Sequence, residues 1–106
     1  MVAVEEVKKW LQKAIELAPW EGKIMLGIAV FYPHENVTIN LWPPLKPFVY
    51  PWVKIWYDPD PDTQFKAHKT IRSKDPETVI EEVKEFYEDF ARRFGLPMKS
   101  VEPAEK

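Results

Sequence analysis

The clearest hydrophobic pattern lies near the C-terminal end of the chain and has the period of an α-helix. Apolar residues recur there at steps of three and four, at Val79, Ile80, Val83, Phe86, Tyr87, Phe90, Ala91 and Phe94. Asp75 is a favourable N-cap, Pro76 suits the first helical position, and Gly95 followed by Pro97 suits a helix end. The pattern therefore predicts a helix over about residues 76–94.

A second amphipathic pattern opens the chain. Its apolar positions are again spaced by three and four residues, at Val4, Val7, Leu11, Ala14, Ile15 and Ala18. Pro19 cannot continue a helix, because its ring removes the amide hydrogen that the next turn needs. We therefore expect an N-terminal helix that ends just before Pro19.

Between the two predicted helices the pattern changes to that of β-strands. Residues 23–32 are apolar at nearly every position, which is typical of a strand covered on both faces. Residues 36–42, 48–57 and 65–72 alternate instead between apolar and polar positions, as half-buried strands do. The element order is then α-β-β-β-β-α. It predicts an α+β fold in which a four-stranded antiparallel meander carries both helices on one face.

Two features of this meander need an explanation. Pro51 cannot donate a hydrogen bond to a strand ladder, so the third strand must begin near Trp52 or carry a bulge at residues 50–51. The first strand would lie at an edge, yet it is apolar on both faces. A partner that covers the face opposite the helices would explain that composition.

Alternation also predicts which side chains lie on the face that the helices leave open. If Val37, Ile39, Val53 and Ile55 point toward the helices, their neighbours point the other way. The opposite face then carries Thr38, Asn40, Trp42, Trp52, Lys54, Trp56, Lys66, His68, Thr70 and Arg72. Large exposed apolar patches usually mark interaction surfaces.

Two functions fit such a face, and ordinary packing of the tryptophans at the edge of the core is a third interpretation. The first function is a non-catalytic protein interface with a second copy of the chain, as a homodimer, or with another protein. Its residues would be Trp42, Trp52, Trp56 and Asn40. The alternative is single-stranded nucleic-acid binding, with bases stacked on the same tryptophans. Its further contacts would be Lys54, Lys66, His68 and Arg72.

Composition limits these functions. Fifteen Lys and Arg against seventeen Asp and Glu leave a net charge of −2, so no basic field of the whole molecule attracts nucleic acid. The absence of cysteine excludes disulfides, thiolate metal sites and a cysteine nucleophile. Eleven prolines against three glycines, with many Lys and Glu residues, are typical of proteins from thermophiles.

No pattern predicts catalysis, a cofactor or a metal site. Residues 58–62 place three aspartates at alternate positions, as a calcium loop begins. The sixth and twelfth positions of that loop carry Thr63 and Lys69 in place of glycine and glutamate, so we interpret the segment as a rigid turn. Apart from Glu35 beside His34, whose side chains diverge on a turn, neither His34 nor His68 has an Asp or Glu neighbour at metal-ligand spacing. We therefore expect a module without cofactor or metal.

The length of 106 residues fits one domain, over residues 1–96, followed by a loose tail over residues 97–106. No apolar run approaches the roughly 18 residues that a membrane span needs. The charged opening residues do not form a signal peptide. We therefore expect a soluble, cytoplasmic protein without membrane contact.

Overall fold

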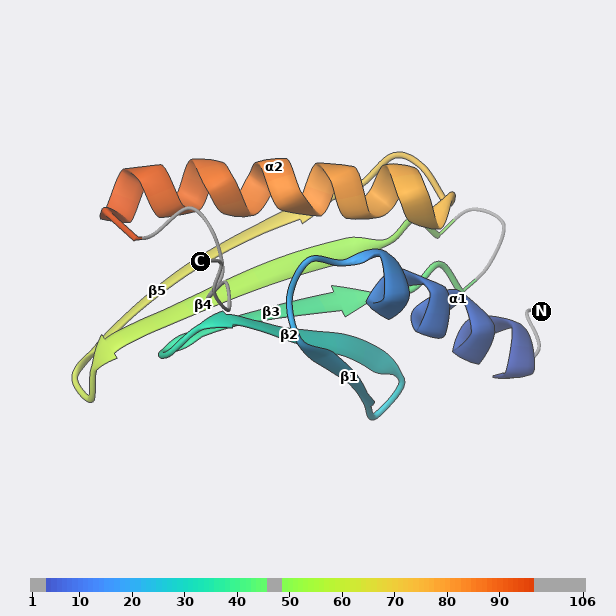
Figure 1. The fold of residues 1–106 in the computed structure, drawn as a ribbon, viewed down its shortest axis with the longest axis horizontal. Helices are drawn as coiled ribbons and strands as arrows, with labels where there is room; N and C mark the ends of the chain where they lie inside the picture. The colour runs from blue at the N-terminus through green and yellow to red at the C-terminus, as the bar shows by residue number, and fades with distance from the viewer. Residues whose placement is uncertain (1–3, 46–48, 97–106) are drawn as a thin grey trace, which may run out of the picture.

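The computed structural model describes residues 4–45 and 49–96, which form two helices and a five-stranded sheet (Figure 1). The helices are α1 (Val4–Leu17) and α2 (Pro76–Phe94). The strands are β1 (Gly22–Met25), β2 (Ile28–His34), β3 (Val37–Trp42), β4 (Trp52–Asp60) and β5 (Thr63–Thr70). They pair as an antiparallel meander in the order β1-β2-β3-β4-β5. The predicted α+β class is confirmed, the predicted number of four strands is wrong, and the tail expected at residues 97–106 lies outside the described residues.

The additional strand arises because residues 23–32 form a hairpin and not one long strand. β1 pairs with β2, Met25 lies opposite Ile28, and Leu26 and Gly27 make the turn. Both turn residues have positive φ, 51° for Leu26 and 81° for Gly27, as two-residue hairpin turns of type I′ require. Leucine is rare at positive φ, so the sequence pattern hides the turn. The prediction of one strand covered on both faces is therefore wrong. The composition of residues 23–32 then no longer argues for a partner that covers the face opposite the helices.

Both helices lie where the sequence predicts them. The Asp75 side chain accepts a hydrogen bond at 3.0 Å from a backbone amide of the first turn of α2, and Pro76 follows it. Gly95 ends α2 with a φ of 70°, a left-handed conformation that glycine adopts without strain. α1 ends at Leu17, shortly before Pro19.

The helices cover the same face of the sheet, and the core lies between them and that face (Figure 1). One cluster of buried side chains joins the two helices to the sheet. It includes Leu11, Ala14, Ala29, Phe31, Val37, Ile39, Leu41, Val53, Ile55, Val79, Val83, Tyr87 and Phe90. Trp20 completes it, with its ring edge-to-face against Phe31 and Tyr87 at centroid distances of 5.7 Å. The core therefore uses only one side of the sheet.

Three prolines lie at irregular points of the sheet. β4 begins at Trp52, as expected, so Pro51 lies just outside the ladder. Pro33 and Pro59 lie inside β2 and β4, each at a place where the pairing register shifts. A local break in pairing tolerates a residue that has no amide hydrogen.

Tyr87 is fully buried in the core, and its hydroxyl has no hydrogen-bond partner within the described residues. Burial raises the pKa of Tyr87 from its ordinary value of 10.0 to about 12, because the phenolate would lose its hydration. The unfolded chain therefore releases this proton at a lower pH than the folded protein does. The resulting stabilisation is complete below pH 10 and is lost as the pH rises toward about 12.

We expect the Tyr87→Phe variant to be at least as stable as the wild type at neutral pH, because it removes a buried hydroxyl without a partner. We also expect it to lose less stability than the wild type between about pH 10 and pH 12. Urea unfolding at neutral pH and at about pH 11 measures both effects. An equal loss of stability at alkaline pH in the two proteins would contradict the raised pKa of Tyr87.

Candidate functional site

The face of the sheet that points away from the helices is the candidate site. Its side chains alternate along the strands with those of the buried core. On β5, the ion pair between Lys69 and Glu82 of α2, at 3.5 Å, marks the helix side. We call the opposite side the open face. It comprises Lys23, Met25, Ile28, Val30, Tyr32, Thr38, Asn40, Trp42, Trp52, Lys54, Trp56, Lys66, His68 and Thr70.

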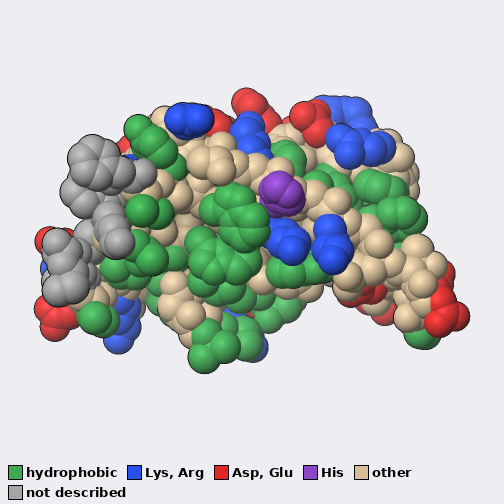
Figure 2. Space-filling view, turned by 180° about the vertical axis from the view of Figure 1, so that it is seen from behind, with side chains coloured by type: hydrophobic (Ala, Val, Ile, Leu, Met, Phe, Trp, Pro, Cys, Tyr) green, Lys and Arg blue, Asp and Glu red, His purple; other side chains and the backbone are tan. Residues whose placement is uncertain are grey.

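Figure 2 shows the molecule from behind, where hydrophobic side chains gather across the middle of this face. Cationic side chains and a histidine lie directly beside them. This grouping is the one that alternation predicts.

The strand register brings two of the three tryptophans together. Trp42 and Trp52 lie opposite each other on β3 and β4, with ring centroids 4.6 Å apart and planes inclined by 55°. The His68 ring lies 5.6 Å from that of Trp52. At the same end of the sheet, Ile28 of β2 lies opposite Met25 of β1. We call Trp52, Trp42, Ile28 and Met25 the tryptophan row.

A second row, two residues further along the strands, carries cations. His68 lies opposite Lys54, Lys54 opposite Asn40, Asn40 opposite Val30, and Val30 opposite Lys23. We call these five residues the basic row. Strand geometry places it about 7 Å from the tryptophan row. Aromatic and cationic side chains thus form adjacent parallel rows that cross the sheet.

At the centre of the basic row, the Val30 side chain and the Asn40 amide oxygen are buried, although they lie outside the main core. Val30 is 6% exposed and is not part of the core cluster. The Oδ1 atom of Asn40 is buried and has no hydrogen-bond partner within the described residues. An unpaired buried amide oxygen is destabilising.

Trp56 lies apart from the other two tryptophans. It is opposite Thr38 on β3 and Lys66 on β5. The Nζ atom of Lys54 is 4.7 Å from the centre of its indole ring, a cation–π distance. Trp56 is therefore paired with a cation of the basic row and not with another indole.

Arg72 also lies apart from the rows, beyond the end of β5. Its guanidinium is 5.7 Å from the centre of the Tyr50 ring, and the Nζ atom of Lys74 is 5.3 Å from the same ring. Tyr50 precedes β4 and is 39% exposed. The structure thus brings Trp42, Trp52 and His68 together, while Arg72 joins Tyr50, which the alternation pattern does not identify.

β1 and β2 add three residues to this face that alternation along the other strands does not assign to it. The Nζ atom of Lys23 is 5.8 Å from the centre of the Tyr32 ring, and the Tyr32 hydroxyl is 3.9 Å from the sulfur of Met25. Met25 and Tyr32 are each 41% exposed. A hairpin turn predicted at Gly27 would have placed all three residues on this face.

The open face carries positive charge without carboxylates. None of its residues is Asp or Glu, and Lys23, Lys54 and Lys66 form no ion pair with a carboxylate of the described residues. The whole chain has a net charge of −2, so its excess acidic residues lie elsewhere. The local charge of the face is therefore opposite in sign to that of the molecule.

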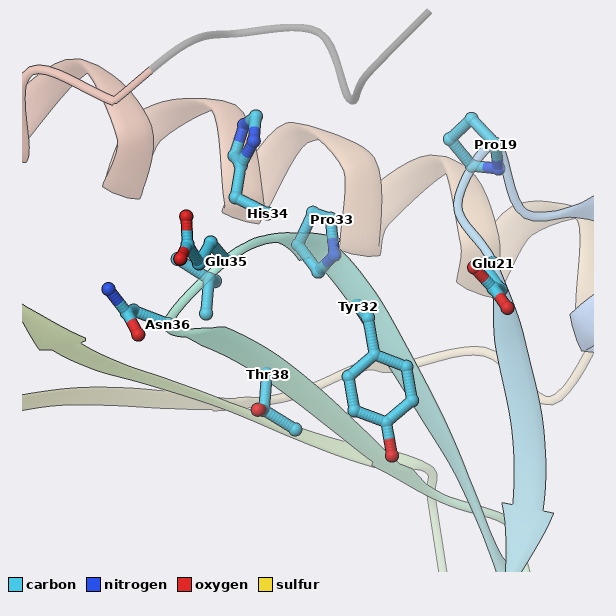
Figure 3. Close-up of a pocket in the computed structure, with 9 residues that line it drawn as sticks. Pro19, Glu21, Tyr32, Pro33, His34, Glu35, Asn36 and Thr38 are labelled. Carbon is cyan, nitrogen blue, oxygen red and sulfur yellow. The ribbon is translucent and has the colours of Figure 1, made fainter. Parts of the chain in front are cut away.

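Carboxylates begin beyond one end of the face, away from the tryptophan row. Glu21 and Glu35 line an open hollow of about 480 Å³ together with Tyr32 and Thr38. Figure 3 shows Glu21 on one side of Tyr32, and Thr38 and Glu35 on the other. Because like charges repel, an anionic ligand is directed away from this hollow and toward the tryptophan and basic rows.

The aspartates at 58, 60 and 62 belong to the β4–β5 hairpin, at the same acidic end. Asp58 Oδ1 accepts a hydrogen bond from Gln64 Nε2, and Asp60 Oδ1 accepts one from the backbone amide of Asp62, both at 2.9 Å. β4 continues to Asp60, so the turn is shorter than expected. Within residues 4–45 and 49–96, no group of three or more His, Cys, Asp or Glu side chains could hold a metal ion. The other histidine, His34, lies against Tyr87, with ring centroids 6.2 Å apart.

No protein-family model matches the chain, and neither a curated protein nor a solved structure matches it. In the part of the chain that the structure describes, no helix is long and apolar enough to cross a membrane. The chemistry of the open face is therefore the basis for a functional proposal.

Proposed function

We propose that the open face binds single-stranded nucleic acid. The supporting observation is the tryptophan row beside the basic row, whose lysines, Lys23 and Lys54, have no carboxylate partner among the described residues. Indole rings accept stacked bases of any sequence, and lysines at this distance reach the phosphates that join them. Both helices lie on the other face of the sheet, so they do not cover these side chains.

Each part of the face has a role in this proposal. Trp42 and Trp52 hold each other at an inclined angle and offer indole surface to bases, and His68 extends that surface onto β5. Lys54 and Lys23 contact phosphates from the basic row.

A protein interface is the second candidate, and the exposed apolar side chains of Met25 and Tyr32 favour it. A twofold sheet-on-sheet dimer, however, would bring Lys23, Lys54 and Lys66 of both copies into one layer. The open face supplies no carboxylate to pair with them, and burying unpaired charges is costly. The charge pattern therefore supports a polyanionic ligand over a second copy of the same face.

Neutralising the lysines of the face should weaken the salt dependence of binding. For single strands, the logarithm of the affinity falls with the logarithm of salt concentration by about 0.7 per phosphate contact. We therefore expect Lys54→Gln and Lys66→Gln each to reduce that slope by about 0.7 and to lower the affinity at low salt. Fluorescence anisotropy of a labelled oligothymidylate between about 50 and 200 mM salt measures both quantities.

Lys69→Gln is the matched control for these variants. Lys69 lies on the same strand as Lys66 but faces the helices, where it pairs with Glu82. Its replacement should leave the salt slope unchanged. A wild-type protein that does not bind the oligothymidylate at low salt would refute the proposal, as would equal effects of Lys54→Gln and Lys69→Gln.

A further inference from the structure

Leu26, at the tip of the β1–β2 hairpin, combines two unfavourable properties. Its φ of 51° lies in the left-handed region, where the Cβ atom of an L-residue crowds the following carbonyl. Its side chain is 99% exposed, so no burial within the described chain offsets that strain. Asparagine or glycine is favoured at this turn position. A strained apolar residue that gains nothing inside the fold points to a contact outside it.

The tip lies beside the β1 end of the tryptophan row, just beyond the end of that strand. Met25 ends that row on β1, and Leu26 follows it directly. Figure 1 shows the β1–β2 hairpin projecting at this edge. Lys23 ends the basic row on the same strand, so a cation accompanies the apolar tip. The tryptophan row and the basic row therefore both extend to the edge strand β1.

The charges of the molecule favour a ligand that crosses the strands over one that follows them. A path along β4 would lead past Trp56 to the aspartates of the β4–β5 hairpin. A path across the sheet instead keeps bases over the tryptophan row and phosphates over the basic row. Five strands about 4.8 Å apart span about 19 Å, and this path ends at Met25, directly beside Leu26.

We propose that the Met25–Leu26 tip is a wedge that contacts the nucleic acid where it leaves the tryptophan row. The inference rests on the proposed function of the open face. Leucine and methionine are among the apolar side chains that proteins insert between neighbouring bases, where they interrupt base stacking. Leu26 separates the first base beyond the sheet from those stacked over the indoles, and Lys23 contacts the adjoining phosphate.

The Leu26→Asn variant tests the wedge without weakening the fold. It places an asparagine before Gly27, the dipeptide that type I′ turns favour, so its denaturation midpoint should rise. We expect it to bind a labelled oligothymidylate that extends beyond β1 about tenfold more weakly than the wild type does. An oligothymidylate short enough to end on the tryptophan row should bind both proteins equally. Val4→Asn, which replaces an apolar side chain 82% exposed at the start of α1, is the control and should change neither affinity.

The outcomes separate this inference from the proposal on which it rests. If the wild type binds the longer oligothymidylate and Leu26→Asn binds it equally well, the wedge is wrong and the function of the open face stands. If the wild type binds neither oligothymidylate, both are wrong. Vesicles of phosphatidylcholine and phosphatidylserine provide a further arm. The wild type could adsorb to these vesicles, and Leu26→Asn could abolish that adsorption while it binds the oligothymidylate as well as the wild type does. This result would assign the tip to a lipid surface and overturn the wedge.

Discussion

Replacing Trp52 with alanine is expected to weaken oligothymidylate binding by about one to two orders of magnitude. Stacking of one base on an aromatic side chain contributes about 1–3 kcal/mol. Trp52 contacts both Trp42 and His68, so the substitution removes one ring of the platform and disturbs the two beside it. Fluorescence anisotropy at low salt measures the loss, and the salt slope should stay as in the wild type because no charge is removed.

Trp52→Phe serves as the matched control. It keeps a ring on the open face, so it should retain most of the affinity that the alanine variant loses. Trp52 is half-buried on the side opposite the core cluster, and both variants should therefore stay folded at room temperature. An unchanged affinity of a folded Trp52→Ala protein would show that bases do not stack on this row.

Phe90→Ala is expected to destabilise the protein by about 3–5 kcal/mol, because a buried aromatic side chain leaves a cavity when it is truncated. Phe90 is 2% exposed in α2. Its ring centroid lies 4.6 Å from that of Phe94 and 6.4 Å from that of Tyr57. Urea denaturation should show a lower midpoint with an unchanged slope.

Phe65→Ala is the comparison for this effect. Phe65 is 37% exposed on the edge strand β5, and its ring also lies 4.6 Å from that of Phe94. Its truncation removes aromatic contacts with Phe94 and Tyr57, each worth about 0.5–1.5 kcal/mol, and should cost less than truncation of the buried Phe90. Equal losses from Phe65→Ala and Phe90→Ala would mean that Phe90 is not a core residue.

Features with a local periodic signal could be predicted from the sequence. The apolar spacing of α2, with Asp75 and Gly95 at its ends, follows from helix geometry and capping chemistry within one segment. The two-residue period of β3 and β4 likewise assigns Trp42 and Trp52 to the open face. These predictions need no knowledge of which strands are neighbours.

The β1–β2 hairpin could not be predicted in this way, because its turn has an unusual residue. Leu26 adopts positive φ against its own preference, and Gly27 alone is a weak turn signal. The continuous apolar run on both sides of the turn then resembles one covered strand. Pro33 adds to the difficulty, because it lies inside β2 at a register shift that alternation does not reveal.

The arrangement of the candidate site depends on register, which a single sequence leaves open. Alternation places Trp42, Trp52, Trp56 and His68 on one face but does not say which of them touch. Pairing across β3, β4 and β5 decides that Trp42, Trp52 and His68 meet, while Trp56 lies beside Lys54.

Sedimentation velocity with a fluorescein-labelled oligothymidylate, at about 50 and 500 mM salt, tests the central claim most directly. The account predicts a protein that sediments as a monomer near 12.5 kDa at both salt concentrations. The label should move with the protein at low salt and separate from it at high salt. The contradicting result is a species of twice the monomer mass that persists at high salt while the label stays unbound at both salt concentrations. That result would support the protein interface instead.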